Sequence, residues 1–237
     1  MLDFNSQSRT ERVIVALDCG RDEALDLARK LQGKASWMKV GMTLYYAEGP
    51  SIVAALKDMG YKVFLDLKFH DIPHQVKGAA ASAIATGADM ITMHAVGSIP
   101  MMQAAQEAAN EARSEVVTLA ITVLTSMNAE TLAETGVTRN LEDQVRAMAC
   151  NARTAGLSGV VASPLEAPML RELLGPEACI VTPGVRPAGA ALGDQSRVTT
   201  PAQAFDNGAS HIVVGRPITA AADPVAAFDA IAKELES

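Results

Sequence analysis

Short apolar runs rich in valine, isoleucine and leucine alternate along the chain with longer segments rich in alanine, leucine and glutamate. Most of the short runs are apolar throughout instead of at every second residue, which is typical of parallel strands covered by helices. They predict strands at Val13–Leu17, Trp37–Val40, Tyr61–Lys68, Met90–His94, Val116–Val123, Gly159–Ala162, Ile180–Thr182 and His211–Val214.

The longer segments predict helices, and their ends carry helix signals. Thr200 and Asp223 each precede a proline, as an N-cap residue does before proline at the first helical position. Several glycines directly follow these segments, where a left-handed residue commonly ends a helix; they are Gly33, Gly60, Gly87, Gly156, Gly175 and Gly208. The predicted helices are Glu23–Leu31, Gly49–Met59, Pro73–Thr86, Pro100–Ala112, Leu141–Ala155, Pro164–Leu174, Pro201–Asn207 and Pro224–Leu235.

Eight strand–helix units occupy 237 residues, and no linker, low-complexity tract or block of like charges divides them. We therefore predict one domain over residues 1–237 with the α/β fold of a (β/α)8 TIM barrel, whose typical size is about 250 residues. An open doubly wound sheet is the alternative. It normally has a glycine-rich turn after its first strand, whereas Asp18-Cys19-Gly20-Arg21 contains one glycine, so the barrel is favoured.

The composition restricts the classes of partner. Apolar residues make up 49% of the chain and charged residues 20%, which is ordinary for a soluble globular protein. The net charge of −7, without any cluster of lysine and arginine, argues against nucleic acid and membrane as partners, because both require a basic surface. A small anionic ligand held by a few local cations is compatible with this balance.

Cysteine usage and the N-terminal sequence indicate a cytoplasmic protein. Cys19, Cys150 and Cys179 are widely spaced and form no CxxC or Cys/His pattern, which predicts reduced thiols and no zinc site. The first residues lack the basic and then apolar pattern of a signal peptide. The apolar run from Val116 to Leu124 is far shorter than the roughly 20 residues of a membrane-spanning helix.

The third predicted strand carries charges where a buried strand should be apolar. Side chains alternate between the two faces of a strand, so Asp66 and Lys68 point one way while Leu65 and Leu67 point the other. Opposite charges on the inward face of a buried strand are costly to desolvate unless they are paired. The strand therefore indicates a functional site.

Other polar residues follow the predicted strands, at the end of a TIM barrel where catalytic groups lie. Lys39, Asp66, Lys68 and Asp71 form a set of two cations and two carboxylates, which is typical of a catalytic lysine but also of an ion-pair network that only closes the barrel. The Gly215-Arg216 turn after the last strand suits a phosphate, although a lone turn of this kind is also common in ordinary loops. The long segment Pro183–Arg197 is expected to form a lid. The remaining polar residues at these ends are Asp18, His94, Thr125, Ser126 and Arg186.

The segment Asp66-Leu67-Lys68-Phe69-His70-Asp71-Ile72-Pro73 resembles the D-x-K-x-x-D signature of the orotidine 5′-monophosphate decarboxylase family. The signature alone is shared with sister decarboxylases and synthases, but further matches occur in order along nearly the whole chain. They are Val15–Asp18, Lys39–Gly41, Thr125-Ser126, Thr182–Pro187, Asp194-Gln195 and Val214–Ile218.

The resemblance implies decarboxylation of orotidine 5′-phosphate to uridine 5′-phosphate, the last step of de novo pyrimidine synthesis, without a metal or organic cofactor. It implies that Lys68 protonates C6 of the pyrimidine while Asp66 lies against the departing carboxylate. Lys39 and Asp71 would complete the array of alternating charges. By the family pattern Asp71 enters the active site of the other subunit, so a homodimer is expected.

The resemblance also implies how the substrate is bound. Asp18 and Lys39 would contact the ribose hydroxyls, and Thr125 and Ser126 the ribose and the pyrimidine edge. The 5′-phosphate would be held under the lid by Arg186, Gln195, Gly215 and Arg216. One position departs from the family, which commonly has threonine where this chain has Gln75.

Two rival functions remain open at this point. A magnesium-dependent sugar-phosphate decarboxylase or synthase shares the signature, but it carries an acid at the end of the second strand, where Lys39 would repel the ion. A non-catalytic nucleotide-binding barrel would keep the phosphate site. Binding alone, however, does not require a lysine among carboxylates.

Overall fold

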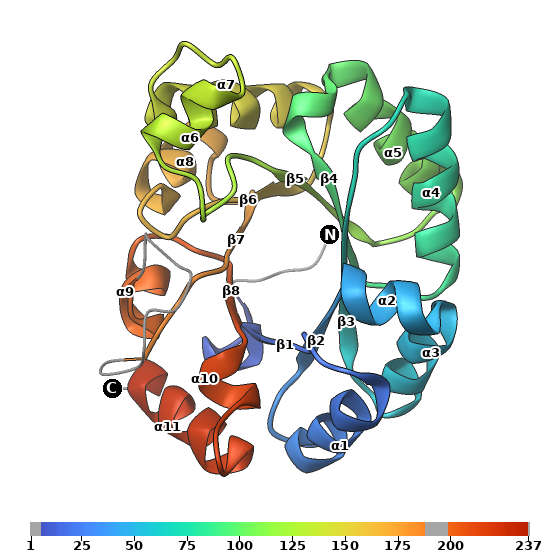
Figure 1. Ribbon diagram of the computed structural model, residues 1–237, viewed down its shortest axis with the longest axis vertical. Coiled ribbons are helices and arrows are strands. Elements are labelled where there is room, and N and C mark those ends of the chain that lie inside the picture. The colour runs from blue at the N-terminus through green and yellow to red at the C-terminus, as the bar shows by residue number, and fades with distance from the viewer. Residues whose placement is uncertain (1–5, 188–198, 237) are drawn as a thin grey trace.

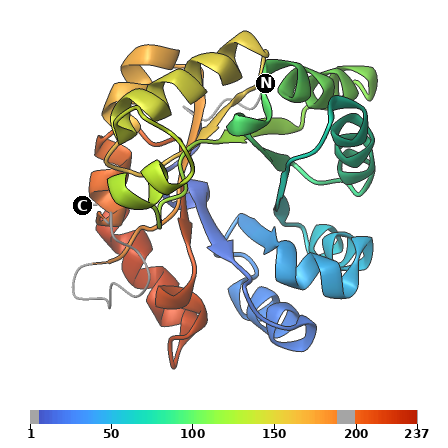
Figure 2. The same cartoon turned by 45° about the horizontal axis from the view of Figure 1, so that its top comes forward.

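The computed structural model describes residues 6–187 and 199–236. Within these ranges, eight parallel strands close into a barrel in sequence order, with helices around the outside (Figures 1 and 2). The strands are β1 (Val13–Ala16), β2 (Trp37–Gly41), β3 (Lys62–Phe69), β4 (Met90–His94), β5 (Val117–Ile121), β6 (Gly159–Val161), β7 (Cys179–Thr182) and β8 (His211–Val214).

Pairing of the first strand with the last closes the sheet. Val13 of β1 pairs with Ile212 of β8, and Ile14 pairs with Trp37 of β2. An open doubly wound sheet has no such pairing, so the predicted TIM barrel is confirmed and the alternative is excluded.

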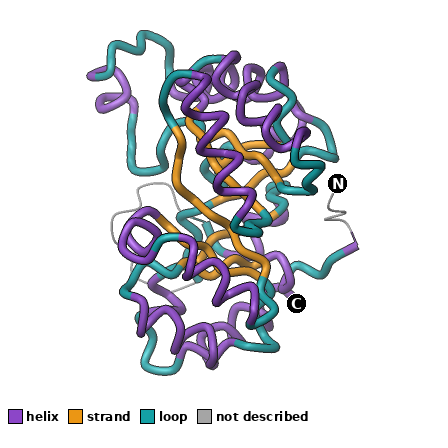
Figure 3. The backbone as a smooth tube through the Cα atoms, turned by 90° about the vertical axis from the view of Figure 1, so that its right-hand side faces the viewer, coloured by secondary structure: helices purple, strands orange, loops and turns teal. Residues whose placement is uncertain are grey.

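Alternate residues of the strands form two apolar layers. Inward-facing side chains such as Ile14, Trp37 and Phe64 fill the barrel, whereas their neighbours Val15, Met38 and Leu65 belong to the larger core between the strands and the helices. Figure 3 shows the backbone from the side, with the strands in the middle and the helices flanking them. Because both faces of every strand are covered, the strands are mostly apolar on both faces.

The helices agree with the sequence pattern at most of their ends. Thr200 accepts a hydrogen bond from the backbone of Gln203 in a capping box, and all six glycines predicted to end helices have positive φ. The α-helices are α1 (Arg21–Leu31), α2 (Met42–Glu48), α3 (Pro50–Asp58), α4 (Pro73–Ala85), α5 (Ile99–Glu111), α6 (Ala129–Glu134), α7 (Leu141–Thr154), α8 (Ala167–Leu174), α9 (Pro201–Asp206), α10 (Arg216–Thr219) and α11 (Pro224–Glu236); short 3-10 helices span Thr10–Arg12 and Ala95–Gly97.

Most predicted ends shift by one or two residues, as for β5, and four helices differ more. The helices α2, α6 and α10 were not predicted, since each is a short segment after a strand. Helix α8 begins at Ala167 and not at Pro164, because Glu166 closes a turn in which its backbone N–H donates to the carbonyl of Ser163 and its carboxylate accepts from the N–H of Ser163.

All three cysteines are free thiols. No helix in the described ranges is both long enough and apolar enough to cross a membrane.

Candidate functional site

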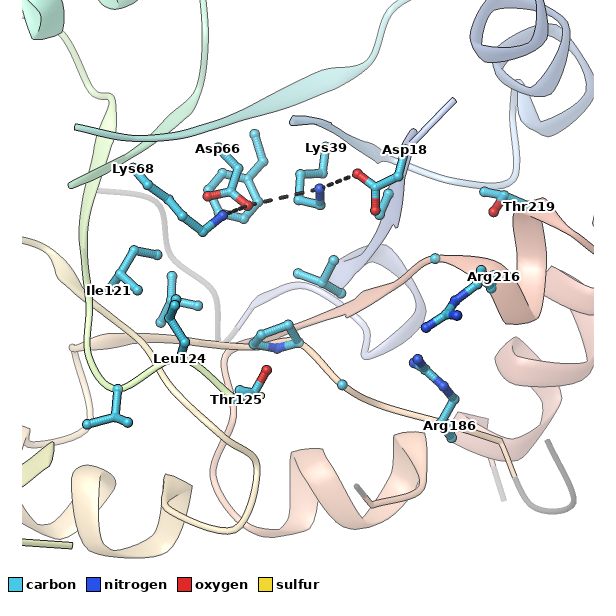
Figure 4. Close-up of a pocket in the computed structure, with 18 residues that line it drawn as sticks. Asp18, Lys39, Asp66, Lys68, Ile121, Leu124, Thr125, Arg186, Arg216 and Thr219 are labelled. Atoms are coloured by element: carbon cyan, nitrogen blue, oxygen red, sulfur yellow. Dashed lines mark hydrogen bonds and ion pairs between the residues drawn. The ribbon is translucent and has the colours of Figure 1, made fainter. Parts of the chain in front are cut away.

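A cavity of about 420 Å³ opens at the carboxyl ends of the strands (Figure 4). Its polar and charged side chains come from β2 and β3, from the residues that follow β1, β5 and β7, and from α10, so segments far apart in the sequence meet there. The lining residues are Ala16, Asp18, Lys39, Phe64, Asp66, Lys68, Ile121, Val123, Leu124, Thr125, Val161, Pro183, Gly184, Arg186, Val213, Gly215, Arg216 and Thr219.

Four charged side chains form a row along one side of the cavity, with acids and lysines alternating (Figure 4). Lys68 Nζ donates to Asp66 Oδ2 at 2.8 Å, and Lys39 Nζ lies 4.0 Å from the same oxygen. Lys39 Nζ also donates to Asp18 Oδ1 at 2.8 Å. Lys39 and Asp66 are buried, while the Asp18 side chain is 66% exposed at the opening of the cavity. Each lysine therefore has a carboxylate partner.

The close pair of Lys39 and Asp18 depends on a glycine at the end of β2. A Cβ atom at Gly41 would lie 3.2 Å from both Lys39 Nζ and Asp18 Oδ1. Such a contact is shorter than carbon usually makes with a polar atom, so one of the two charged groups would have to move. Gly41 therefore leaves the space that the ion pair occupies.

Strand β3 is irregular at Lys68. Leu65 pairs with Ile91 of β4, but the next paired residue on β3 is Phe69, opposite Met93. Lys68 has φ of +54°, a left-handed conformation that is uncommon for residues other than glycine. Asp66 and Lys68 do lie together as predicted, yet Lys68 reaches its partner from a bulged backbone and not from regular strand alternation.

Two arginines lie across the cavity from the row of charges (Figure 4). Arg186 follows β7 and Arg216 begins α10 directly after β8, and Figure 4 shows both guanidinium groups extending toward the same part of the cavity. Arginine binds phosphate oxygens with two parallel hydrogen bonds. This part of the cavity is suited to a phosphate group.

Apolar side chains line the floor between these two charged regions. Phe64, Val161 and Val213 belong to the buried cluster inside the barrel, and Ile121 lies beside them. A flat, apolar part of a ligand can pack there while its polar ends reach the two sides. Within a cavity of this size such a site fits one small molecule with a phosphate at one end.

His94 ends β4 close to Lys68, and its ring centre lies 5.6 Å from that of His70. Burial lowers the pKa of His94, and the nearby His70 and Lys68 lower it further. The Asp66 carboxylate opposes this shift, but the net effect on the pKa favours the neutral imidazole. Neither histidine is among the residues that line the cavity.

The structure brings together most, but not all, of the residues predicted for the site. The cavity is lined by Asp18, Lys39, Asp66, Lys68, Thr125, Arg186, Gly215 and Arg216. Ser126 and Asp71 are exposed and do not line the cavity of their own chain, and Gln75 is exposed in the first turn of α4. Gln195 and most of the predicted lid fall among residues 188–198, outside the described ranges.

Sequence reasoning missed the apolar floor and Thr219. The floor residues sit on predicted strands, but their sequence does not distinguish a cavity floor from the packed interior of a barrel. Thr219 lies on α10, which was not predicted as a helix; one turn of helix after Arg216 brings it to the cavity. Pro217, which follows Arg216, is the sequence feature that could have predicted this helix, because proline is common in the first turn of a helix.

Comparisons with known proteins agree with this geometry. Residues 11–231 match the family model described as "Orotidine 5'-phosphate decarboxylase / HUMPS family". The orotidine 5'-phosphate decarboxylase of Moorella thermoacetica is 51% identical over 233 residues, which cover 95% of this chain and 92% of the relative. That of Nitrosococcus oceani is 48% identical over 227 residues, covering 95% of this chain and 98% of the relative.

Solved structures give the same result. The crystal structure of orotidine 5'-phosphate decarboxylase from Lactobacillus acidophilus matches with a TM-score of 0.85 at 38% identity and covers 96% of this chain and 100% of that one. An uncharacterized conserved protein from Geobacillus kaustophilus matches with a TM-score of 0.83 at 38% identity, covering 94% and 99% of the two chains. The resemblance inferred from the sequence motifs is thus confirmed, and the chain belongs to the orotidine 5′-phosphate decarboxylase family.

Proposed function

We propose that this chain converts orotidine 5′-phosphate to uridine 5′-phosphate and CO2, with Lys68 as the proton donor to C6 of the pyrimidine. The reaction is that of the family to which the chain belongs. The observation that carries the role of Lys68 is its ammonium group, held 2.8 Å from Asp66 Oδ2 inside a cavity that has two arginines on its other side.

The chemistry of the step requires a fixed cation. Breaking the bond between C6 and the carboxylate leaves an electron pair on C6 that the pyrimidine ring cannot delocalise. A positive charge placed in advance close to that carbon stabilises the developing negative charge, most strongly where water is excluded. Lys68 can then transfer a proton from Nζ to C6, forming the C–H bond of the product while CO2 departs.

The acids hold the lysines in place. Asp66 accepts from Lys68 and lies near Lys39, so its carboxylate orients both cations. In the proposed complex it also faces the carboxylate that leaves as CO2. Lys39 and Asp18 are proposed to bind the ribose hydroxyls, because Asp18 is exposed at the opening of the cavity and Lys39 is paired with it.

The opposite side of the cavity binds the 5′-phosphate in this proposal. Arg186, Gly215 and Arg216, which line this side of the cavity, are proposed to contact the phosphate, and Gln195, outside the described ranges, is proposed as a further contact. Thr125, and Ser126 next to it, contact the ribose and the pyrimidine edge. Binding energy from the remote phosphate can be used to order the reacting groups.

We propose further that the active enzyme is a homodimer in which Asp71 completes the site of the neighbouring subunit. Asp71 is exposed and absent from the cavity of its own chain, which is what a residue donated to a partner requires. Large apolar side chains are exposed after five consecutive strands at the same end of the barrel, from β2 to β6; they are Met42, Tyr46, Ile72, Val96, Leu124 and Leu165. Exposed apolar groups of this kind are typical of subunit interfaces.

Residues 1–237 are proposed to act as one cytoplasmic domain. The pairing of β1 with β8 supports the single domain, since the two ends of the chain share one barrel. The free cysteines agree with a reducing compartment.

The change in ultraviolet absorbance of orotidine 5′-phosphate on decarboxylation tests the reaction. We expect purified protein to produce that change in the presence of EDTA. Activity that appears only when magnesium is added would favour the metal-dependent sister enzymes. An unchanged spectrum would contradict the proposed reaction and favour a nucleotide-binding protein without catalytic activity.

Replacement of Lys68 tests the proton donor. Lys68→Ala should still bind uridine 5′-phosphate, but its turnover should fall by at least about 10²- to 10⁴-fold, the usual contribution of a positioned general acid. Lys34→Ala is the matched control, because Lys34 forms an ion pair with Asp229 on the surface away from the cavity. Comparable turnover in both variants would remove Lys68 from the mechanism.

Mixing two inactive variants tests the shared site. Each dimer of Lys68→Ala with Asp71→Asn contains one site with both changes and one site with neither. Equal mixing and subunit exchange should therefore restore about a quarter of the wild-type activity, provided that the dimer has twofold symmetry. If mass spectrometry verified that the subunits had exchanged and no activity returned, Asp71 would act in the site of its own subunit.

A further inference from the structure

Thr92 lies in the middle of β4, completely buried beneath the row of charges. Its single hydroxyl group makes two hydrogen bonds to functional residues. Thr92 Oγ1 donates to Asp66 Oδ1 at 2.9 Å and accepts from the backbone N–H of Lys68 at 2.9 Å. A hydroxyl has one proton to donate and two lone pairs to accept with, so both bonds can exist together.

The bond to Lys68 replaces a missing contact between two strands. Between Leu65 and Phe69 on β3 lie three residues, 66 to 68, whereas between their partners Ile91 and Met93 on β4 lies only Thr92. A bulge of this kind leaves backbone groups of the longer strand without their regular partners. The side chain of Thr92 supplies an acceptor to one of them, the Lys68 amide.

The same bond acts where the backbone is strained. Lys68 has φ of +54°, a conformation that is unfavourable outside glycine and persists only when the surroundings enforce it. If the amide lost its acceptor, the backbone at Lys68 would be free to relax toward an extended conformation. The ammonium group at the end of the side chain would then move relative to the cavity.

The bond to Asp66 fixes the rotation of its carboxylate. Thr92 holds Oδ1, which leaves Oδ2 to accept from Lys68 Nζ at 2.8 Å. Lys39 Nζ lies 4.0 Å from the same Oδ2. One buried hydroxyl therefore holds the carboxylate at one oxygen and the lysine at its backbone.

We propose that Thr92 is a positioning residue of the decarboxylation, which holds the carboxylate of Asp66 and the backbone of Lys68 in the geometry needed for proton transfer. This inference rests on the proposed role of Lys68 as the proton donor. Thr92 does not line the cavity, so its effect is on the rate of the chemical step and not on binding. Misplacement of a reacting group by about 1 Å can slow a reaction by about 100-fold.

The test compares Thr92→Val, which keeps the shape but loses both hydrogen bonds, with Thr92→Ser, which keeps the hydroxyl. We expect kcat of Thr92→Val to fall roughly 10- to 100-fold. Its KM and its Kd for uridine 5′-phosphate should stay within about threefold of the wild-type values. Thr92→Ser should have most of the wild-type kcat. Thr118→Val is the matched control, since Thr118 is equally buried on β5 and bonds Gln106 outside the cavity. It should lower the melting temperature without lowering kcat.

A wild-type kcat in Thr92→Val would overturn the inference, as would an equal loss of kcat in Thr118→Val or a failure of Thr92→Ser to recover activity. If Thr92→Val does not fold, Thr92→Ala carries the same expectation, because its smaller side chain adds no apolar group against the freed amide and carboxylate. Lys68→Ala separates the two proposals. If Lys68→Ala is active, Lys68 is not the proton donor. If Lys68→Ala is inactive and Thr92→Val is fully active, only the positioning role of Thr92 is contradicted.

Discussion

Acid should destabilise this protein through a histidine buried at the opposite end of the barrel from the cavity. His211 is the first residue of β8, has no exposed surface and lies edge-on to Trp37, with the two ring centres 5.3 Å apart. Burial lowers its pKa to about 3, and the positive charges of Arg12 and Lys62 contribute to the shift. The folded protein therefore holds this imidazole in the neutral form.

The sign and size of the effect follow from the two pKa values. In the unfolded chain a histidine has a pKa of about 6.5, so between about pH 6.5 and pH 3 the unfolded chain binds a proton that the folded protein does not. The stabilising contribution is complete above pH 6.5 and is lost as the pH falls. At pH 5 the loss is about 2 kcal/mol, because 1.5 pH units at about 1.36 kcal/mol each separate that pH from the unfolded pKa.

Thermal unfolding of wild type and His211→Gln across this pH range measures the contribution. A loss of about 2 kcal/mol corresponds to a fall in Tm of roughly 4–8 °C for a domain of this size. The fall between pH 7.5 and pH 5 should be smaller by that amount in His211→Gln, even if the substitution lowers Tm at both values. Above pH 7.5 the two curves should run parallel, which serves as the internal control. Parallel curves over the whole range would refute the assignment of acid sensitivity to His211.

Two further predictions concern the phosphate side of the cavity and the packing of the barrel. Arg216→Ala should raise KM for orotidine 5′-phosphate at least about 10-fold, because it removes a charge-assisted contact with the phosphate. The affinity for uridine, which has no phosphate, should be unchanged. If calorimetry showed that both ligands bind equally more weakly, Arg216 would not be a phosphate-binding residue. Gly159→Ala should lower the free energy of unfolding in urea by more than about 2 kcal/mol, since the new Cβ would overlap the backbone carbonyl of Cys179 on β7. A variant as stable as wild type would show that β6 and β7 can move apart without loss of stability.

The fold was predictable because nearly every element carries a local signal. The strands are continuous apolar runs, and glycines such as Gly33 and Gly87 adopt the left-handed backbone expected after a helix. The prediction was weakest for short helices. α10 contains the single turn Arg216–Thr219, and a segment of that length has too few residues for a helical period to be recognised.

The site was predictable to the extent that charge on a buried strand is rare. Lys39 and Asp66 could be identified from their positions on apolar strands, and both are buried in the cavity. Thr92 could not be identified in that way, because a threonine is common in strands and its sequence does not show which groups its hydroxyl meets. That information lies in the irregular pairing of β3 with β4, which depends on both strands at once.

Lys39 connects the exposed opening of the cavity, at Asp18, with the buried pair of Asp66 and Lys68. Asp66 lies on β3, paired with Gly41 of β2, and Lys68 is held there by Thr92 and Asp66, whereas Arg186 and Arg216 lie on segments that follow strands and can adjust to a ligand. Lys39 is on β2, but its ammonium is 2.8 Å from the exposed Asp18 and 4.0 Å from the buried Asp66. A ligand that contacts Asp18 therefore acts on Lys39 directly, and through Lys39 on the carboxylate that holds Lys68. The row of alternating charges is thus a short physical connection between the proposed ribose site at Asp18 and the proposed proton donor Lys68.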